Sequence, residues 1–143
     1  MSGYTAFVDG SSRGNPGPAA IGVAVFKNDN PETPVAEISR SIGMTTNNVA
    51  EYEAVIAAVK WFIDHEIKAG AIKMDSELVY KQLRGEYRVK TAHLVTLRRR
   101  VRDLLAQAGE IQIILIPRTG NKKADRLAQR ASKAHKKPPA DPV

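Results

Sequence analysis

The sequence predicts an α/β domain, and three observations support this fold class. The chain has 143 residues, 43% of them hydrophobic, which is enough for a single packed core. Its hydrophobic pattern switches between the alternation of strands and the longer period of amphipathic helices. The resulting order is three strands, a helix, a strand, two helices, a strand and a final helix. Short connections join the first three strands, which indicates an antiparallel meander.

The three leading strands are separated by turn signals. A first strand covers residues 4–9 and runs into a cluster at 10–18 that holds three glycines and two prolines. That density of structure-breaking residues predicts no regular structure within the cluster. A second strand covers 19–27. After a turn at 28–34, a third strand with alternating faces covers 35–42.

Helices and strands then alternate along the chain. Residues 52, 55, 56, 59 and 63 are hydrophobic at helical spacing, and Asn48 with Glu51 resembles a capping box at the start of that helix. The remaining predicted elements are a short buried strand at 71–75, helices at 76–83 and 94–108, a strand at 110–116 that ends at Pro117, and a last helix at 121–133.

These elements make one domain, residues 1–133, and the Pro-rich basic segment 134–143 is predicted to be a disordered tail. The chain has no cysteine, which excludes disulfides and thiolate metal sites. Its longest stretch without polar side chains is about nine residues, against roughly 20 for a bilayer span. The first residues lack the order of a secretory signal. We therefore expect a cytoplasmic protein with no membrane association.

The charge is divided unevenly along the chain. Residues 1–80 hold 6 Lys/Arg and 10 Asp/Glu, a net charge of −4. Residues 81–143 hold 16 Lys/Arg and 5 Asp/Glu, a net charge of +11. This clustering of basic residues indicates a polyanionic partner. The alternative is an ordinary solvated surface.

Four carboxylates occupy related positions in the predicted fold. Asp9 and Asp75 end strands, whereas Glu51 and Asp125 lie near helix starts. Carboxyl ends of strands and nearby helix starts form the crevice where α/β sheets bind ligands. Carboxylates that meet there repel one another unless a cation lies among them, and Mg²⁺ prefers such oxygen ligands.

Local roles are an alternative explanation for three of these residues. Glu51 could complete a helix cap, Asp75 could be the N-cap of the next helix, and Asp125 could interact with its helix dipole. Asp9 follows Phe7 and Val8 directly, so it abuts the core and is the hardest to explain locally. Spacing alone does not show that the four carboxylates converge.

Four segments resemble the motifs of type I ribonuclease H, in the order of that family. They are FVDGSSRGNPGPA at 7–19, TTNNVAEY at 45–52, DSELV at 75–79 and NKKADRLA at 121–128. The resemblance implies the ribonuclease H fold, a five-stranded mixed sheet with three antiparallel strands first, flanked by helices. It also implies an endonuclease that cuts the RNA strand of RNA/DNA hybrids, leaving 3′-hydroxyl and 5′-phosphate ends. No obligatory protein partner is evident in the sequence, and we expect a monomer.

The resemblance also implies roles for individual residues. Asp9, Glu51, Asp75 and Asp125 correspond to catalytic carboxylates that hold two Mg²⁺ or Mn²⁺ ions. The residues that correspond to minor-groove contacts are Gly14, Asn15, Asn47 and Asn48, and Thr46 corresponds to a DNA phosphate contact. Turn formation by Asn15, and capping by Asn47 or Asn48, are local alternatives that are compatible with these roles.

The chain departs from some family members in two places. The segment before the last carboxylate lacks the histidine that those members have there, and Arg118 is the candidate to take over part of its role. His65, His93 and His135 are expected at the surface. Residues 85–93 are too short for a basic protrusion. Candidate phosphate contacts are Lys81, Arg84, Arg88, Lys90 and the basic run at 98–102. For that run, a solvated helix face is the alternative. The aromatic residues Tyr4, Phe7 and Trp61 are expected in the core.

Two other function classes remain open at this level. One is a non-catalytic nucleic-acid-binding domain on the same fold, against which the presence of all four acids argues. The other is a related nuclease that acts on DNA junctions or double-stranded RNA.

Overall fold

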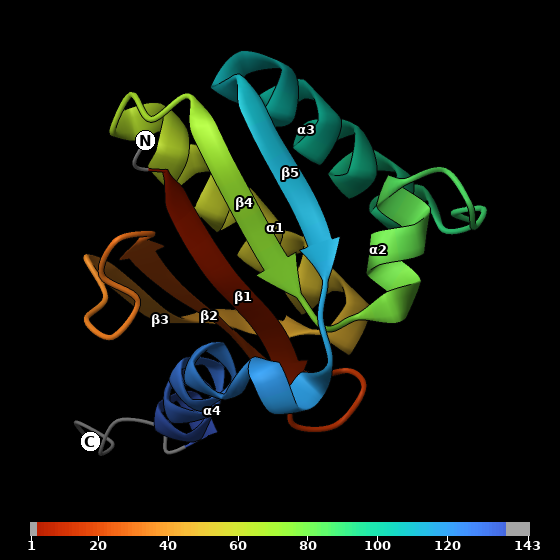
Figure 1. Cartoon of the computed structure of the whole chain (residues 1–143). Helices are drawn as coiled ribbons and strands as arrows, with labels where there is room; N and C mark the ends of the chain where they lie inside the picture. The colour runs from red at the N-terminus through yellow and green to blue at the C-terminus, as the bar shows by residue number, and fades with distance from the viewer. Residues whose placement is uncertain (1–2, 137–143) are drawn as a thin grey trace.

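The computed structural model describes residues 3–136, and the side chains of residues 3–133. Its five strands form one mixed sheet in the order β3-β2-β1-β4-β5 (Figure 1). The antiparallel meander consists of β1 (Tyr4–Ser12), β2 (Gly17–Lys27) and β3 (Ala36–Thr45). On the other side of β1, β4 (Ala69–Met74) and β5 (Glu110–Leu115) pair in parallel. The predicted fold class is therefore confirmed.

Helices cover the two faces of the sheet unequally. The helical elements are α1 (Asn47–Asp64), α2 (Glu77–Leu83), α3 (Ala92–Ala108), the 3-10 turn η1 (Arg118–Gly120) and α4 (Lys122–Lys136). One face carries α1, with α3 packed on α1, while α4 lies on the opposite face against β2 and β3 (Figure 1). The α4-side face of β4 and β5 has no helix over it in Figure 1.

The main core lies between the sheet and α1. Alternate residues of β1 and β2, such as Val8, Ile21 and Val23, point toward the apolar side of α1 and are buried. A second apolar layer joins β2 to α4, where Gly22 allows close approach. A Cβ at Gly22 would lie 2.1 Å from the carbonyl oxygen of Ala124. Glycine is therefore required for α4 to pack directly on the sheet.

The predicted irregular cluster at 10–18 is shorter in the structure. Pairing between β1 and β2 continues to Ser12 opposite Ala19, and the backbone N–H of Arg13 donates to the carbonyl of Pro18 (2.8 Å). The local prediction was wrong here because antiparallel pairing stabilises the ends of both strands despite the glycines and prolines. Only residues 13–16 connect the strands. The third strand likewise extends to Thr45.

The last helix extends past the predicted boundary of the domain. It runs to Lys136, whereas the sequence predicted an end at 133. The rest of the predicted tail, 137–143, and the side chain of His135 lie outside the described residues. Among the described helices, none is both long and apolar enough to cross a membrane.

The aromatic residues are less buried than the sequence suggested. Tyr4 and Trp61 pack against the core but stay half-buried, and Trp61 stacks on the exposed ring of His65 with centroids 4.0 Å apart. His93 is also exposed, as predicted. Phe7 is not a member of the core cluster. Its alternation in β1 points it to the other face, where its ring meets the edge of Phe26.

Candidate active site

Three carboxylates from three separate elements meet at the carboxyl end of the central strands. Asp9 lies in β1, Glu51 in α1 and Asp75 directly after β4. Each contributes an oxygen, and these oxygens all lie within 4.8 Å of one another. Asp9 is 7% and Glu51 5% exposed, and Asp75 is half-buried. The structure therefore brings together three of the four carboxylates that the sequence singled out.

The backbone of Gly10 joins two of the carboxylates. Its N–H donates to Oδ1 of Asp9 and to Oε1 of Glu51, both at 3.0 Å. A Cβ at this position would lie 2.2 to 2.5 Å from backbone atoms of Ala50 and Glu51. The absence of a side chain at Gly10 thus lets the start of α1 approach β1 closely enough to share one amide.

The local roles proposed for Glu51 and Asp75 are wrong. Helix α1 is capped by the hydroxyl of Thr46, which accepts from the N–H of Val49, and Asn48 is not its N-cap. Helix α2 is capped by Ser76 and not by Asp75. Because hydroxyl groups already fill both cap positions, the carboxylates of Glu51 and Asp75 remain available to the cluster.

Asp125 lies at the edge of the cluster, in the first turn of α4. It is half-buried and close enough to Asp9 to raise the pKa of Asp9 by hydrogen bonding and by its charge. Its place in the first turn also suits the helix dipole, so the local interpretation and membership of the cluster are compatible.

The acidic cluster is electrostatically strained in the absence of a cation. Burial, followed by the charges of Glu51 and Asp75, raises the pKa of Asp9 to about 9. Burial and the charge of Asp75 likewise raise the pKa of Glu51 to about 8. Hydrogen bonding to Gly10 and the charge of Arg118 act in the opposite direction on Glu51. A site with only oxygen donors and excess negative charge fits hard divalent cations such as Mg²⁺ or Mn²⁺.

Asn121 is a part of the site that the sequence analysis missed. It is 1% exposed, and its Nδ2 donates to Oδ2 of Asp75 (2.9 Å) and to the carbonyl of Val8 (2.8 Å). The only sequence signal was its place in the fourth motif, directly before the last helix. No local pattern identifies partners 46 and 113 residues away.

Hydrogen bonds connect two of the predicted substrate residues between the β1–β2 loop and the start of α1. The side chain of Asn15 accepts from the N–H of Asn47 (2.9 Å), and the side chain of Asn47 accepts from the N–H of Ser12 (3.1 Å). These two bonds fasten the β1–β2 loop to the start of α1. Gly14, Asn15 and Asn47 are exposed, whereas Thr46 and Asn48 are half-buried.

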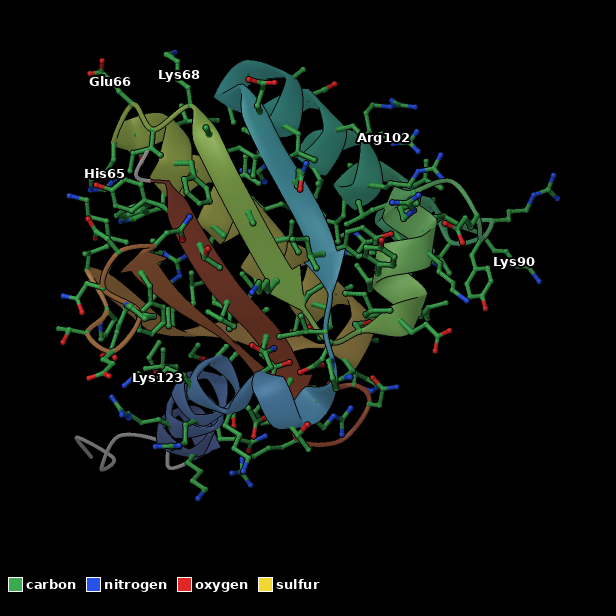
Figure 2. The ribbon with its side chains drawn as sticks, viewed as in Figure 1. His65, Glu66, Lys68, Lys90, Arg102 and Lys123 are labelled. Carbon is green, nitrogen blue, oxygen red and sulfur yellow. The ribbon has the colours of Figure 1, made fainter. Side chains whose placement is uncertain are left out.

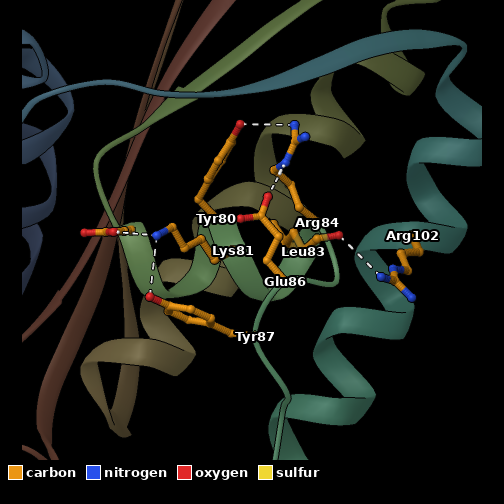
Figure 3. Close-up of polar contacts among 8 residues, drawn as sticks. Tyr80, Lys81, Leu83, Arg84, Glu86, Tyr87 and Arg102 are labelled. Atoms are coloured by element: carbon orange, nitrogen blue, oxygen red, sulfur yellow. Dashed lines mark hydrogen bonds and ion pairs between the residues drawn. The ribbon is translucent and has the colours of Figure 1, made fainter.

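The predicted basic contacts differ in their surroundings. Arg118, on η1, is exposed and lies close enough to Glu51 to lower its pKa. Lys81 on α2 and Arg84, the C-cap of α2, both bond to neighbouring side chains (Figure 3). Lys81 pairs with Glu77 (2.9 Å), and Arg84 pairs with Glu86 (2.8 Å) and donates to the hydroxyl of Tyr80 (3.2 Å). Of these three basic residues, Arg118 is the one whose charge shifts the pKa of a cluster member.

Other basic residues lie on α3, on α4 and in the loop between α2 and α3. Figure 2 shows Lys90 and Arg102 on the α2–α3 side of the molecule and Lys123 beside α4. Lys123 pairs with Glu37 on β3 (2.8 Å). His65 is the C-cap of α1, at the end of that helix away from Glu51, and His93 is exposed on α3, so neither belongs to the acidic cluster.

The mixed sheet that begins with an antiparallel meander, with one acid inside β1 and another directly after β4, defines a ribonuclease H-like domain. Asp9 was predicted to end its strand, but β1 continues to Ser12 because it stays paired with β2. The family model described as reverse transcriptase-like matches residues 7–131. The chain is 42% identical to Ribonuclease HI of Halobacterium salinarum over 126 residues, which are 88% of this chain and 62% of that protein. The chain belongs to the type I ribonuclease H family, as its motifs indicated.

Two further comparisons extend this result. The bifunctional protein Rv2228c of Mycobacterium tuberculosis is 42% identical over 130 residues, which are 88% of this chain but only 34% of that protein. The chain thus spans about a third of the mycobacterial relative. Solved structures agree closely. The RNase H1 of Halobacterium salinarum has a TM-score of 0.87 at 40% identity, and the alignment covers 92% of this chain and 98% of that one.

A structure with nucleic acid is also similar. LC11-RNase H1 in complex with an RNA/DNA hybrid has a TM-score of 0.86 at 33% identity, covering 94% of this chain and 99% of that one. The fold and the family predicted from the sequence are thereby confirmed.

Proposed function

We propose that this protein is a metal-dependent endoribonuclease that hydrolyses the RNA strand of RNA/DNA hybrids, leaving 3′-hydroxyl and 5′-phosphate ends. The observation that carries the proposal is the convergence of Asp9, Glu51 and Asp75, whose oxygens lie within 4.8 Å, with Asp125 beside them. Membership of the ribonuclease H family and the hybrid bound by LC11-RNase H1 support the choice of substrate.

The four carboxylates would hold two Mg²⁺ ions, with Mn²⁺ as an alternative. Bound ions of this kind supply activation of the attacking water and stabilisation of the leaving 3′-oxygen. The protein's own contribution is to fix the ligands. The amide of Gly10 orients Asp9 and Glu51, and the buried position of both carboxylates keeps bulk water from screening the site.

Recognition of RNA depends on the 2′-hydroxyl, which can both donate and accept hydrogen bonds. The surface formed by Gly14, Asn15, Asn47 and Asn48 offers backbone and side-chain amide groups that can donate or accept hydrogen bonds. Thr46 would contact a phosphate of the DNA strand. Arg118 would contact a phosphate near the acids, and Lys81 and Arg84 would do so further along α2.

A cleavage assay tests this function directly. A hybrid with a 5′-labelled RNA strand is incubated with the protein under a titration of Mg²⁺ or Mn²⁺, and the product ends are characterised. We expect endonucleolytic cleavage of the RNA strand that stops with EDTA. Binding of the hybrid without cleavage at any metal concentration would identify a non-catalytic binding domain instead.

Two control duplexes test the substrate class. Duplex DNA and duplex RNA of the same sequence should be cut far more slowly than the hybrid. Preferential cleavage of either control would show that the site serves a different nuclease activity.

We also propose that the protein acts as a monomer in the cytoplasm. All four carboxylates come from one chain, so no second copy is needed to complete the site. Light scattering after size exclusion should give a mass near 15.6 kDa. Fractionation of cells that express the protein tests the location.

A further inference from the structure

One buried side chain links three segments of the site. Asn121 precedes α4 and is 1% exposed. Its Nδ2 donates to the carbonyl of Val8, the residue before Asp9, and to Oδ2 of Asp75. Asn121 also lies four residues before Asp125, whose N–H donates to the carbonyl of Asn121 (3.1 Å). Asn121 is therefore connected to the neighbourhoods of Asp9, Asp75 and Asp125.

The orientation of this amide is determined by its partners. A carbonyl oxygen and a carboxylate oxygen both face it, so only the amino group can occupy that side. The consequence is that Oδ1 of Asn121 is buried and has no hydrogen-bond partner among the described residues. Leaving a buried acceptor unsatisfied costs about 1–3 kcal/mol. That cost is offset by two good donor contacts, one of them to a charged group.

The contact with Asp75 restricts the carboxylate. Asp75 lies between β4 and the cap of α2. It is the most exposed of the three carboxylates whose oxygens converge. Among the described residues, the amide of Asn121 is the one hydrogen-bond donor to its carboxylate. Oδ2 is fixed by this bond, which constrains where the other oxygen of Asp75 points.

We propose that Asn121 is a positioning residue that holds the Asp75 carboxylate in the orientation needed for divalent-metal binding and ties the start of α4 to the same site. This inference deepens the proposed function and rests on its metal centre. The readout is metal affinity without substrate, so the inference can hold even if the hybrid proves to be the wrong substrate.

The first test measures Mn²⁺ affinity by calorimetry or electron paramagnetic resonance. Removing an outer hydrogen-bond partner of a metal ligand weakens metal binding by roughly 10–100-fold. We expect a loss in that range for Asn121→Ala. Asn121→Asp, which has the same shape but places a carboxylate against two acceptors, should lose at least as much. Wild-type affinity in both variants would overturn the proposal.

A double-mutant cycle separates positioning from general stability. If Asn121 acts through Asp75, Asn121→Ala should weaken Mn²⁺ binding much less in an Asp75→Ala background. An equal loss in both backgrounds would mean that Asn121 acts only by supporting the fold. Ser132→Ala is the matched control. It removes a buried hydroxyl of α4 that binds Arg13, which should lower stability and leave Mn²⁺ affinity unchanged.

A measurement on the wild-type protein does not depend on the folding of any variant. In nuclear magnetic resonance spectra, the side-chain NH₂ of Asn121 should exchange slowly with water and shift when Mg²⁺ is added. Rapid exchange, or no change in its resonances at saturating Mg²⁺, would contradict the proposed contact. In turnover assays, Asn121→Ala should lower kcat while the KM for the hybrid stays within about twofold of wild type.

Discussion

The backbone N–H of Gly10 donates to Oε1 of Glu51 at 3.0 Å, across 41 positions of the sequence. This contact joins the central strand β1 to the first turns of α1. It is possible only because residue 10 has no Cβ. A Cβ at this position would lie 2.2 to 2.5 Å from backbone atoms of Ala50 and Glu51. The packing of the fold and the assembly of the acidic cluster therefore depend on the same glycine.

Replacing Gly10 should disrupt both properties. Gly10→Ala forces α1 away from β1, with an expected loss of about 1–3 kcal/mol in the free energy of unfolding, as for other overpacked sites. Cleavage of the hybrid should fall by at least about tenfold, because Glu51 moves away from Asp9. Chemical denaturation and initial rates measure the two effects.

A second glycine provides the control for this variant. A Cβ at Gly120 meets no atom closer than 3.9 Å. Gly120→Ala should therefore change the free energy of unfolding by less than about 1 kcal/mol. Equal losses for the two variants would contradict the steric argument.

The protonation of the metal-free cluster predicts how stability depends on pH. Asp9 has a pKa of about 9 in the folded protein, against an ordinary value of 3.8. Between these values the folded state holds a proton that the unfolded state has lost, so stability falls as the pH rises. In EDTA, the wild type should lose more stability than Asp9→Asn between pH 5 and pH 8.

The expected size of this difference is large enough to measure. At pH 8, Asp9→Asn should be more stable than the wild type by more than about 1 kcal/mol, since one pKa unit corresponds to about 1.4 kcal/mol. Thermal melts of both proteins across the pH range test this. Parallel stability curves for the two proteins would show that burial does not perturb Asp9.

Some parts of this site were accessible from sequence and others were not. Periodicity and turn residues identified the strand and helix order, because each depends on neighbouring residues. The positions of Asp9 and Asp75 at strand ends then indicated a shared edge. The contacts of Asn121 and Gly10 join residues 41 to 113 positions apart, so no local pattern contains them. The cap at Thr46 was missed because Asn48 offered an equally good local signal.

Divalent cations should stabilise the protein more at high pH than at low pH. Metal ligands must be deprotonated, and the raised pKa values of Asp9 and Glu51 mean that protons compete with the metal below about pH 8. At 10 mM Mg²⁺, a concentration chosen for the assay, the increase in Tm should therefore be larger at pH 8.5 than at pH 6. The double variant Asp9→Asn, Glu51→Gln should show little increase at either pH. A pH-independent increase in the wild type would indicate binding elsewhere.

Arg118 should contribute to turnover through its place beside Glu51. It is exposed, and its positive charge lowers the pKa of Glu51. Arg118→Ala should reduce kcat several-fold and shift the Mg²⁺ dependence. Arg99→Ala, which removes an equal charge from an exposed position on α3, is the control and should change mainly the salt dependence of binding. Unchanged turnover and metal dependence in Arg118→Ala would exclude a role for this residue.

Asp75→Asn should separate chemistry from binding. The substitution keeps the size of the side chain but removes one of the three carboxylates whose oxygens converge within 4.8 Å. Among the described residues, no hydrogen bond joins Asn15 or Asn47 to Asp75, so affinity for the hybrid should stay within a few-fold of wild type, while cleavage should fall by at least about a thousandfold. Binding in Ca²⁺ or EDTA, followed by cleavage in Mg²⁺, measures both quantities on one preparation.

Asp103→Asn is the control, because it removes an equal charge from an exposed position on α3 and should retain full activity. Full activity in Asp75→Asn would reject the assignment of the metal ligands, and a joint loss of binding and cleavage would mean that Asp75 supports the hybrid-binding surface as well as the chemistry.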